Sequence, residues 1–98
     1  MESAPDTPLL AFFTHARSGP GRRMESLLAH VSRKERERLR VARIDVDASP
    51  EVAERLGVGT VPTILLIMDK RVVGRIEGRA SAPRIERLLD EHLSPLAA

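Results

Sequence analysis

Apolar residues follow two different patterns in the first third of the chain. The run Leu-Leu-Ala-Phe-Phe at positions 9–13 does not alternate with polar residues, which predicts a central strand over 9–14 that is covered on both faces. Further along, a spacing of three and four residues predicts a helix that begins near Pro20, with one apolar stripe: Met24, Leu27, Leu28 and Val31. The charged residues after Val31 predict a solvated last turn with ion pairs within the helix.

The middle of the chain predicts a second strand and a short helix. Residues Val41–Val46 have the composition of a strand. Ser49 and Pro50 follow as a helix cap and first helical residue, and Gly57 marks the end of that helix.

The last third predicts a hairpin and a final helix. Residues 63–68 are apolar, whereas 71–77 are polar enough for the edge strand of a hairpin. Asp69 and Lys70 connect the two strands, and a two-residue primed turn with Lys70 in place of glycine would be strained. Ser81 is placed to cap a helix with one apolar face: Ile85, Leu88, Leu89 and Leu93.

The resulting order is βαβαββα. Parallel crossovers followed by an antiparallel hairpin imply an α/β fold with a four-stranded mixed sheet and helices on both faces. We expect residues 1–7 to form a flexible tail, residues 8–93 to form the domain and residues 94–98 to form a C-terminal tail.

Composition argues against two classes of partner. The 98 residues include no Cys, Trp or Tyr, so a platform of aromatic rings for nucleic-acid bases is not expected. The net charge is only +2, with acidic residues interleaved among the arginines, so nucleic acid is not an expected partner. The chain has no long apolar run and no signal-peptide pattern, which predicts a soluble, cytoplasmic protein without a membrane partner. The bias toward Arg and Ala is compatible with a GC-rich bacterial genome.

The turn Ser18-Gly19-Pro20-Gly21 lies where the first helix begins. Its backbone N–H groups and the helix dipole could hold a carboxylate or phosphate beside Arg17, or the turn could simply carry solvated arginines. A nucleophilic Ser18 would need a base, and His15 alone is poor evidence for one. The histidines and acids show no metal-ligand spacing, so neither a metal nor a cofactor is expected.

Two segments resemble the thioredoxin family. The turn resembles the family's active-site turn with both cysteines of Cys-Gly-Pro-Cys replaced, by Ser18 and Gly21. Within residues 42–67 a short helix, Gly-Val-x-x-Val-Pro-Thr and an apolar strand follow one another, a combination quite specific to the family. The resemblance covers residues 8–93 and implies a minimal thioredoxin-like fold in which Pro62 is the family's cis-proline facing the turn.

The resemblance also implies a redox-inactive member. Thioredoxin chemistry needs a thiolate of low pKa and a second thiol that resolves the mixed disulfide, and this chain has no cysteine. The family's buried Asp and its aromatic neighbours are replaced as well, since the matching positions hold Phe12, Thr14 and Arg17. We therefore expect no disulfide oxidoreductase activity and no enzyme.

In the family, the backbone before the cis-proline pairs with an extended substrate, which needs no thiol. This predicts a binding, scaffold or chaperone-like module for an extended polypeptide; for the loop, a purely structural proline is the alternative. The expected binding residues are Arg17, Ser18, Gly19, Pro20, Thr60, Val61, Pro62 and Gly78. The alternative function is a glutathione-binding or glutathione-transferase-like enzyme that uses Ser18, although such enzymes carry an added helical domain for which this chain is too short.

Full thioredoxins have an additional strand and helix before the turn, and the missing strand would pair with Val41–Val46. The resemblance therefore implies an open sheet edge there. We expect a homodimer or another partner at this edge. Proline at Ala42 or Ile44 is expected to weaken association while leaving the monomer folded.

Overall fold

The computed structural model describes residues 7–15 and 19–93. Its elements are β1 (Leu9–Thr14), α1 (Gly19–Lys34), β2 (Arg40–Asp45), α2 (Pro50–Arg55), β3 (Thr63–Met68), β4 (Arg71–Glu77) and α3 (Ala82–His92). This order is the predicted βαβαββα. Among the described residues, none of the helices combines the length and apolarity that crossing a membrane requires.

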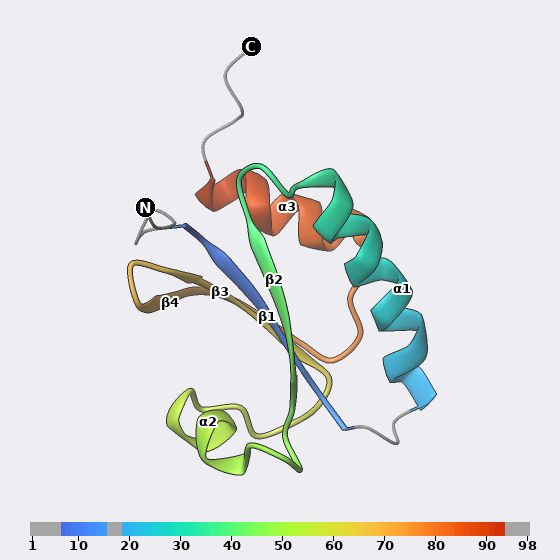
Figure 1. Cartoon of the computed structure of the whole chain (residues 1–98), viewed down its shortest axis with the longest axis vertical. Helices are drawn as coiled ribbons and strands as arrows, with labels where there is room; N and C mark the ends of the chain where they lie inside the picture. The colour runs from blue at the N-terminus through green and yellow to red at the C-terminus, as the bar shows by residue number, and fades with distance from the viewer. Residues whose placement is uncertain (1–6, 16–18, 94–98) are drawn as a thin grey trace.

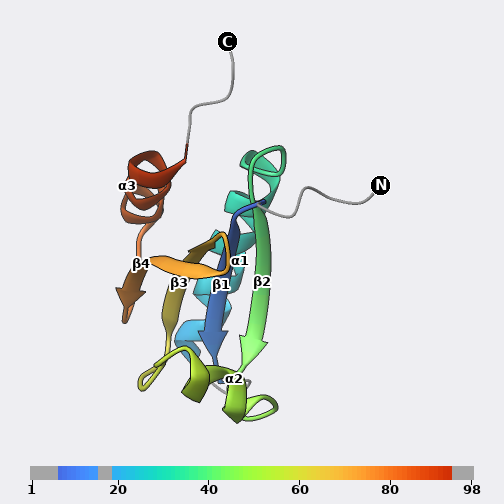
Figure 2. The same cartoon turned by 90° about the vertical axis from the view of Figure 1, so that its left-hand side faces the viewer.

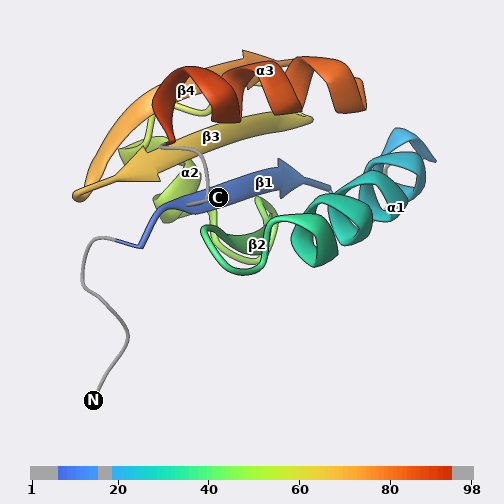
Figure 3. The ribbon, with the colours of Figure 1, turned by 90° about the horizontal axis from the view of Figure 1, so that it is seen from above.

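The strands form one sheet in the order β2-β1-β3-β4, so β2 and β4 are its two edges (Figure 2). β1 runs parallel to β2 and antiparallel to β3, and β3 and β4 form an antiparallel hairpin. α1 and α3 lie on one face and α2 on the other (Figures 1 and 3). The predicted mixed sheet with helices on both faces is therefore confirmed.

The central strand β1 supplies both halves of the core. Phe12 points into the cluster formed with α1 and α3, and Phe13 points into the cluster formed with α2. Both side chains are fully buried. Successive strand residues face opposite sides, so a strand covered on both faces needs apolar residues at every position. This explains why the 9–13 run does not alternate.

The two predicted helix caps have different outcomes. The Ser81 hydroxyl accepts a hydrogen bond from the Arg84 N–H at 3.3 Å, which confirms the cap of α3. Ser49 directly precedes α2, but its side chain makes no capping hydrogen bond. Pro50 at the first helical position lacks an N–H, and its fixed φ already suits the start of a helix.

The prediction of a solvated turn after Val31 is wrong for two of its residues. The helix ends at Lys34, and the Glu35 side chain is only 8% exposed. Arg38 Nε donates to Glu35 Oε1 at 2.6 Å, and Arg38 Nη2 lies 3.7 Å from Asp90 Oδ1 on α3. The hydrogen bond to Glu35 raises the pKa of the Arg38 guanidinium. Contact with α3, which lies far away in the sequence, therefore draws this charged pair out of solvent.

The β3–β4 hairpin takes the conformation that was expected to be strained. Asp69 and Lys70 both have left-handed backbones, with φ of 53° and 65°. Asp tolerates this region because its short side chain can hydrogen-bond locally, whereas Lys has no such compensation. Primed turns match the twist of the flanking strands, which favours this geometry despite the side chain at Lys70.

Candidate functional site

The described part of the predicted active-site turn coincides with the start of α1. Gly19, Pro20 and Gly21 form the first turn of α1. Arg17 and Ser18 fall outside the described residues. The C-terminal end of a strand thus leads toward the N-terminus of a helix, where backbone N–H groups lack partners within the helix.

The loop that follows α2 is held at its first end by Arg75 of β4. Arg75 Nη1 donates to the Gly57 carbonyl and Nη2 donates to the Leu56 carbonyl, each at 3.1 Å. Glu77 lies beside this guanidinium, with an Nη1 to Oε2 distance of 3.3 Å. Gly57 has a left-handed backbone with φ of 73°, which glycine adopts without steric cost. Sequence reasoning missed Arg75, because only the sheet brings it next to the end of α2.

The second end of the loop is held by β3 and by the residue that follows β4. The Val61–Pro62 peptide bond is cis. The Gly78 N–H donates to the Pro62 carbonyl at 2.8 Å, and Thr63 Oγ1 donates to the Thr60 carbonyl at 2.7 Å. The predicted site residues Thr60, Val61, Pro62 and Gly78 are therefore close together in the structure.

Between these two attachments lies a short stretch of accessible backbone. Thr60 is exposed and Val61 is half-buried. The N–H and C=O of Val61 form no hydrogen bond with another described residue. A backbone segment that is held at both ends and has a free donor and acceptor can exchange hydrogen bonds with an added strand.

A histidine and an acid pair beside the end of β1. His15 Nδ1 lies 3.0 Å from Asp47 Oδ2, and the two side chains are 46% and 66% exposed. Asp47 is positioned by its own N–H, which donates to Asp45 Oδ1 at 2.9 Å. His15 is exposed, and its acidic partner was missed in the sequence analysis because the two residues are separated by 32 positions. Both groups are solvated, so the pair is weak.

The part of the chain that the structure describes contains no group of three or more His, Cys, Asp or Glu side chains placed to hold a metal ion. The arrangement can instead offer backbone groups to a polypeptide at the 60–62 loop.

Comparison with known proteins gives matches to thioredoxins. A family model described as thioredoxin matches residues 2–91. A thioredoxin from Alicyclobacillus acidocaldarius is 30% identical over 88 residues, covering 90% of this chain and 84% of the relative. A thioredoxin from Bacillus subtilis is 29% identical over 85 residues, covering 87% and 82%. Among solved structures, the germline-specific thioredoxin Deadhead from Drosophila melanogaster superposes with a TM-score of 0.82 at 26% identity, covering 90% of this chain and 83% of that one.

The expectation of no enzyme, based on the absence of cysteine, is wrong. The relatives are named thioredoxins, which are disulfide oxidoreductases, so the matches point to an enzyme family. The glutathione-dependent alternative is not favoured by these relatives. The absence of cysteine concerns only a few positions, whereas the family match extends along most of the chain. It still limits the chemistry: disulfide exchange by this chain would need sulfur atoms supplied by another molecule.

The predicted thioredoxin-like fold is confirmed by the structural matches and by the mixed sheet with helices on both faces. The family model covers nearly the whole chain, and a 30% identical relative aligns along most of its own length. The chain therefore belongs to the thioredoxin family.

Proposed function

We propose that this thioredoxin-family module binds an extended polypeptide through the loop Thr60-Val61-Pro62, as a scaffold or chaperone-like protein. In this proposal Gly78 and the start of α1, at Gly19 and Pro20, also contact the polypeptide, and the predicted binding residues Arg17 and Ser18 fall outside the described residues. Thioredoxins act on polypeptide substrates, which gives the class of partner.

The observation that carries the proposal is the free backbone of Val61. Its N–H and C=O have no described partner, although the loop is attached to β4 by Arg75 on one side and to Gly78 on the other. A loop held at both ends loses little conformational entropy when a ligand binds, so hydrogen bonds to its backbone contribute more fully to affinity. A loop that only joined two elements would need no such preorganisation.

We further propose that binding is non-covalent, as a redox-inactive Ser18-Gly19-Pro20-Gly21 turn implies. A thioredoxin with cysteines can trap its substrate as a mixed disulfide, which requires a thiolate on the protein. This chain has none, so affinity must come from backbone pairing and from side-chain contacts around the 60–62 loop. The division into tails and one domain, the cytoplasmic location and the bacterial origin stay predictions.

The test is a titration with S-carboxymethylated insulin B chain, an extended polypeptide without free thiols, followed by backbone amide NMR. We expect chemical shift changes at Thr60, Val61 and Gly78. Val61→Pro removes the free N–H, and Val61→Ala keeps it, so the two variants form a matched pair. Loss of one hydrogen bond, worth about 1 kcal/mol, should weaken binding roughly fivefold in the proline variant relative to the alanine variant.

Equal affinities for the two folded variants would contradict backbone pairing at Val61. Shift changes confined to other surfaces would contradict the site itself. Circular dichroism of both variants checks that each retains the fold.

A further inference from the structure

The edge strand β2 has an inner and an outer side that can be assigned residue by residue. The Arg40 N–H donates to the Pro8 carbonyl at 2.9 Å, and the Val46 N–H donates to the Thr14 carbonyl at 3.0 Å. Backbone groups of successive strand residues point to alternate sides. The even-numbered residues of β2 therefore point their N–H and C=O toward β1, and the odd-numbered residues point theirs away from the sheet.

Of the outward-facing residues, Val41 and Arg43 have free backbone groups. No described strand pairs with the outer side of β2. Asp45 differs, because its carbonyl accepts from the N–H groups of Ala48 at 3.1 Å and Ser49 at 2.9 Å. The turn after β2 thus occupies the end of the edge, which leaves two residues whose N–H and C=O lack a described partner.

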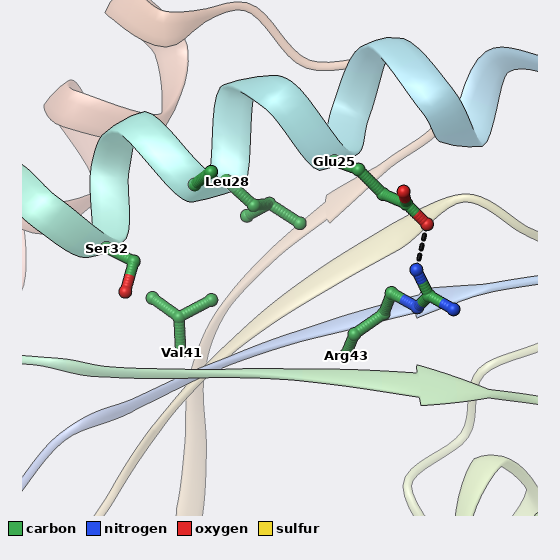
Figure 4. A pocket seen from close by; sticks show the side chains of 6 residues that line it. Glu25, Leu28, Ser32, Val41 and Arg43 are labelled. Carbon is green, nitrogen blue, oxygen red and sulfur yellow. Dashed lines mark hydrogen bonds and ion pairs between the residues drawn. The ribbon is translucent and has the colours of Figure 1, made fainter.

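A hollow of about 270 Å³ runs beside this edge, between α1 and β2 (Figure 4). Leu28, Ala29 and Ser32 line it from α1, and Val41 lines it from β2. At one end, Arg43 Nη1 donates to Glu25 Oε2. This ion pair directs the Arg43 side chain toward α1. The cation therefore does not extend across the open edge, where charged side chains commonly prevent strand pairing.

We propose that the β2 edge pairs with the β2 edge of a second copy of this chain, antiparallel, about a two-fold axis at Ala42. Val41 of each copy then exchanges two N–H···O bonds with Arg43 of the other, so four hydrogen bonds satisfy the outward N–H and C=O groups of Val41 and Arg43 on both copies. The two sheets become one continuous sheet across the axis. The interface is independent of the polypeptide site at Pro62.

The residues of β2 select this register. A two-fold axis between antiparallel strands stands perpendicular to the sheet and must pass beside one residue, which then faces its own symmetry mate. An axis at Arg43 would place two guanidinium groups opposite each other, which is destabilising. An axis at Val41 would place Arg43 opposite Leu39, which precedes the strand and is buried. Ala42 has the smallest side chain in β2 and allows the closest approach of the two strands.

Charge and shape favour a second copy of this chain as the partner at the β2 edge. Each copy carries its own Glu25–Arg43 ion pair to the interface, so neither contributes an uncompensated charge there. Across the axis, Arg43 of one copy lies opposite Val41 of the other. The aliphatic part of the Arg43 side chain covers the apolar residues that line the hollow. An isologous pairing of this kind also closes on itself and leaves no further edge free at β2.

The first experiment is cysteine cross-linking. The chain has no cysteine, so Ala42→Cys introduces a unique thiol. At the axis, the two residues form a non-hydrogen-bonded pair with Cα atoms about 4.5 Å apart, within the range that a disulfide bridges. Val72→Cys places a thiol on the other edge strand, at a residue that is 37% exposed, and serves as the control.

With oxidised glutathione as the two-electron oxidant, we expect Ala42→Cys to form a covalent dimer at least about tenfold faster than Val72→Cys, because pairing raises the effective thiol concentration. Equal rates would overturn the proposal. Preferential cross-linking through Ile44→Cys would overturn this register.

The second experiment measures dimer affinity by sedimentation equilibrium in Arg43→Pro and Arg43→Ala. Proline removes the outward N–H and alanine keeps it, so each proline dimer lacks two of the four hydrogen bonds. We expect roughly thirtyfold weaker association for the proline variant than for the alanine variant. A wild-type chain that is monomeric at several hundred micromolar would overturn the proposal. If Arg43→Pro does not fold, the cross-linking rates of Ala42→Cys and Val72→Cys decide whether the proposal holds. Insulin B chain binding should be unchanged in Arg43→Ala, which separates this interface from the polypeptide site.

Discussion

The two edges of the sheet are built differently. β4 carries an extra residue opposite β3, since the pairing shifts between Leu66 and Ile67, and its exposed side chains include Arg71, Arg75 and Glu77. β2 pairs with β1 one residue to one residue along its whole length, without a shift. Bulges and charged side chains are common means of preventing edge-to-edge association. One edge of this sheet is therefore protected, whereas the other is open to a further strand.

The helices reinforce this difference. α3 packs so closely on β4 that a Cβ atom at Gly74 would lie 2.5 Å from Leu88 Cδ1. Between α1 and β2 there is instead a hollow beside the open edge. The protected edge is therefore tightly covered on one face, and the open edge is only loosely covered.

The largest expected effect tests the inner side of β2. Ile44→Pro removes an N–H that points to β1 and an apolar side chain that packs against the α2 side of the core. The lost hydrogen bond and the lost burial should together lower the free energy of unfolding by about 3–5 kcal/mol. Urea denaturation measures this loss. A monomer as stable as wild type would show that the inner and outer sides of β2 have been assigned the wrong way round.

The prediction that proline at Ala42 or Ile44 weakens association while leaving the monomer folded is therefore wrong. The N–H groups of both residues point into the sheet, as the bonds at Arg40 and Val46 on either side show. Proline there disrupts the monomer. The outward N–H groups belong to Val41 and Arg43.

A smaller effect is expected at the other edge. Gly74→Ala forces Leu88 or the backbone of β4 to move, because the new methyl group would overlap the leucine side chain. Overpacking of this kind should cost about 1–3 kcal/mol of stability. Gly59→Ala is the matched control, since nothing lies within 4 Å of its Cβ position. If thermal denaturation finds the two variants equally stable, α3 does not pack on β4 as closely as described.

The smallest effect concerns the ion pair that joins α1 to α3. Lys34 Nζ donates to Glu86 Oε2 at 2.8 Å, which lowers the pKa of the Glu86 carboxyl and raises the pKa of the Lys34 ammonium. The Glu86 contribution is therefore fully present above its ordinary pKa of 4.5 and is lost as the pH falls through the lower pKa of the folded state. Both groups are solvated, so the contribution is small and is screened by salt.

Thermal melts of Glu86→Gln and wild type across this pH range provide the measurement. The two proteins should differ most near neutral pH and converge in acid. Glu91→Gln, at an exposed residue of the same helix, is the control. A difference that persists unchanged into strong acid would show that Glu86 acts through packing.

Local pattern was enough to predict most of the fold. Apolar spacing identified α1 and α3, the unbroken run at 9–13 identified the central strand, and Ser81 was recognised as a cap. These signals are readable because helix and strand periods act over a few neighbouring residues. For the site, it was the resemblance to the thioredoxin family that assigned Pro62 and Gly78 to one binding site, because no local pattern relates two residues in separate loops.

The sequence by itself determined the class of fold, the family and the absence of a sulfur nucleophile. Only the tertiary structure decided which contacts position the loop and which groups remain free at the sheet edge. Arg75 reaches the carbonyl of Gly57 because β4 lies beside the end of α2, and Glu35 is buried because α3 packs near it. The direction in which each β2 amide points depends on the register with β1. These features join residues that are distant in the sequence, so no local pattern carries them.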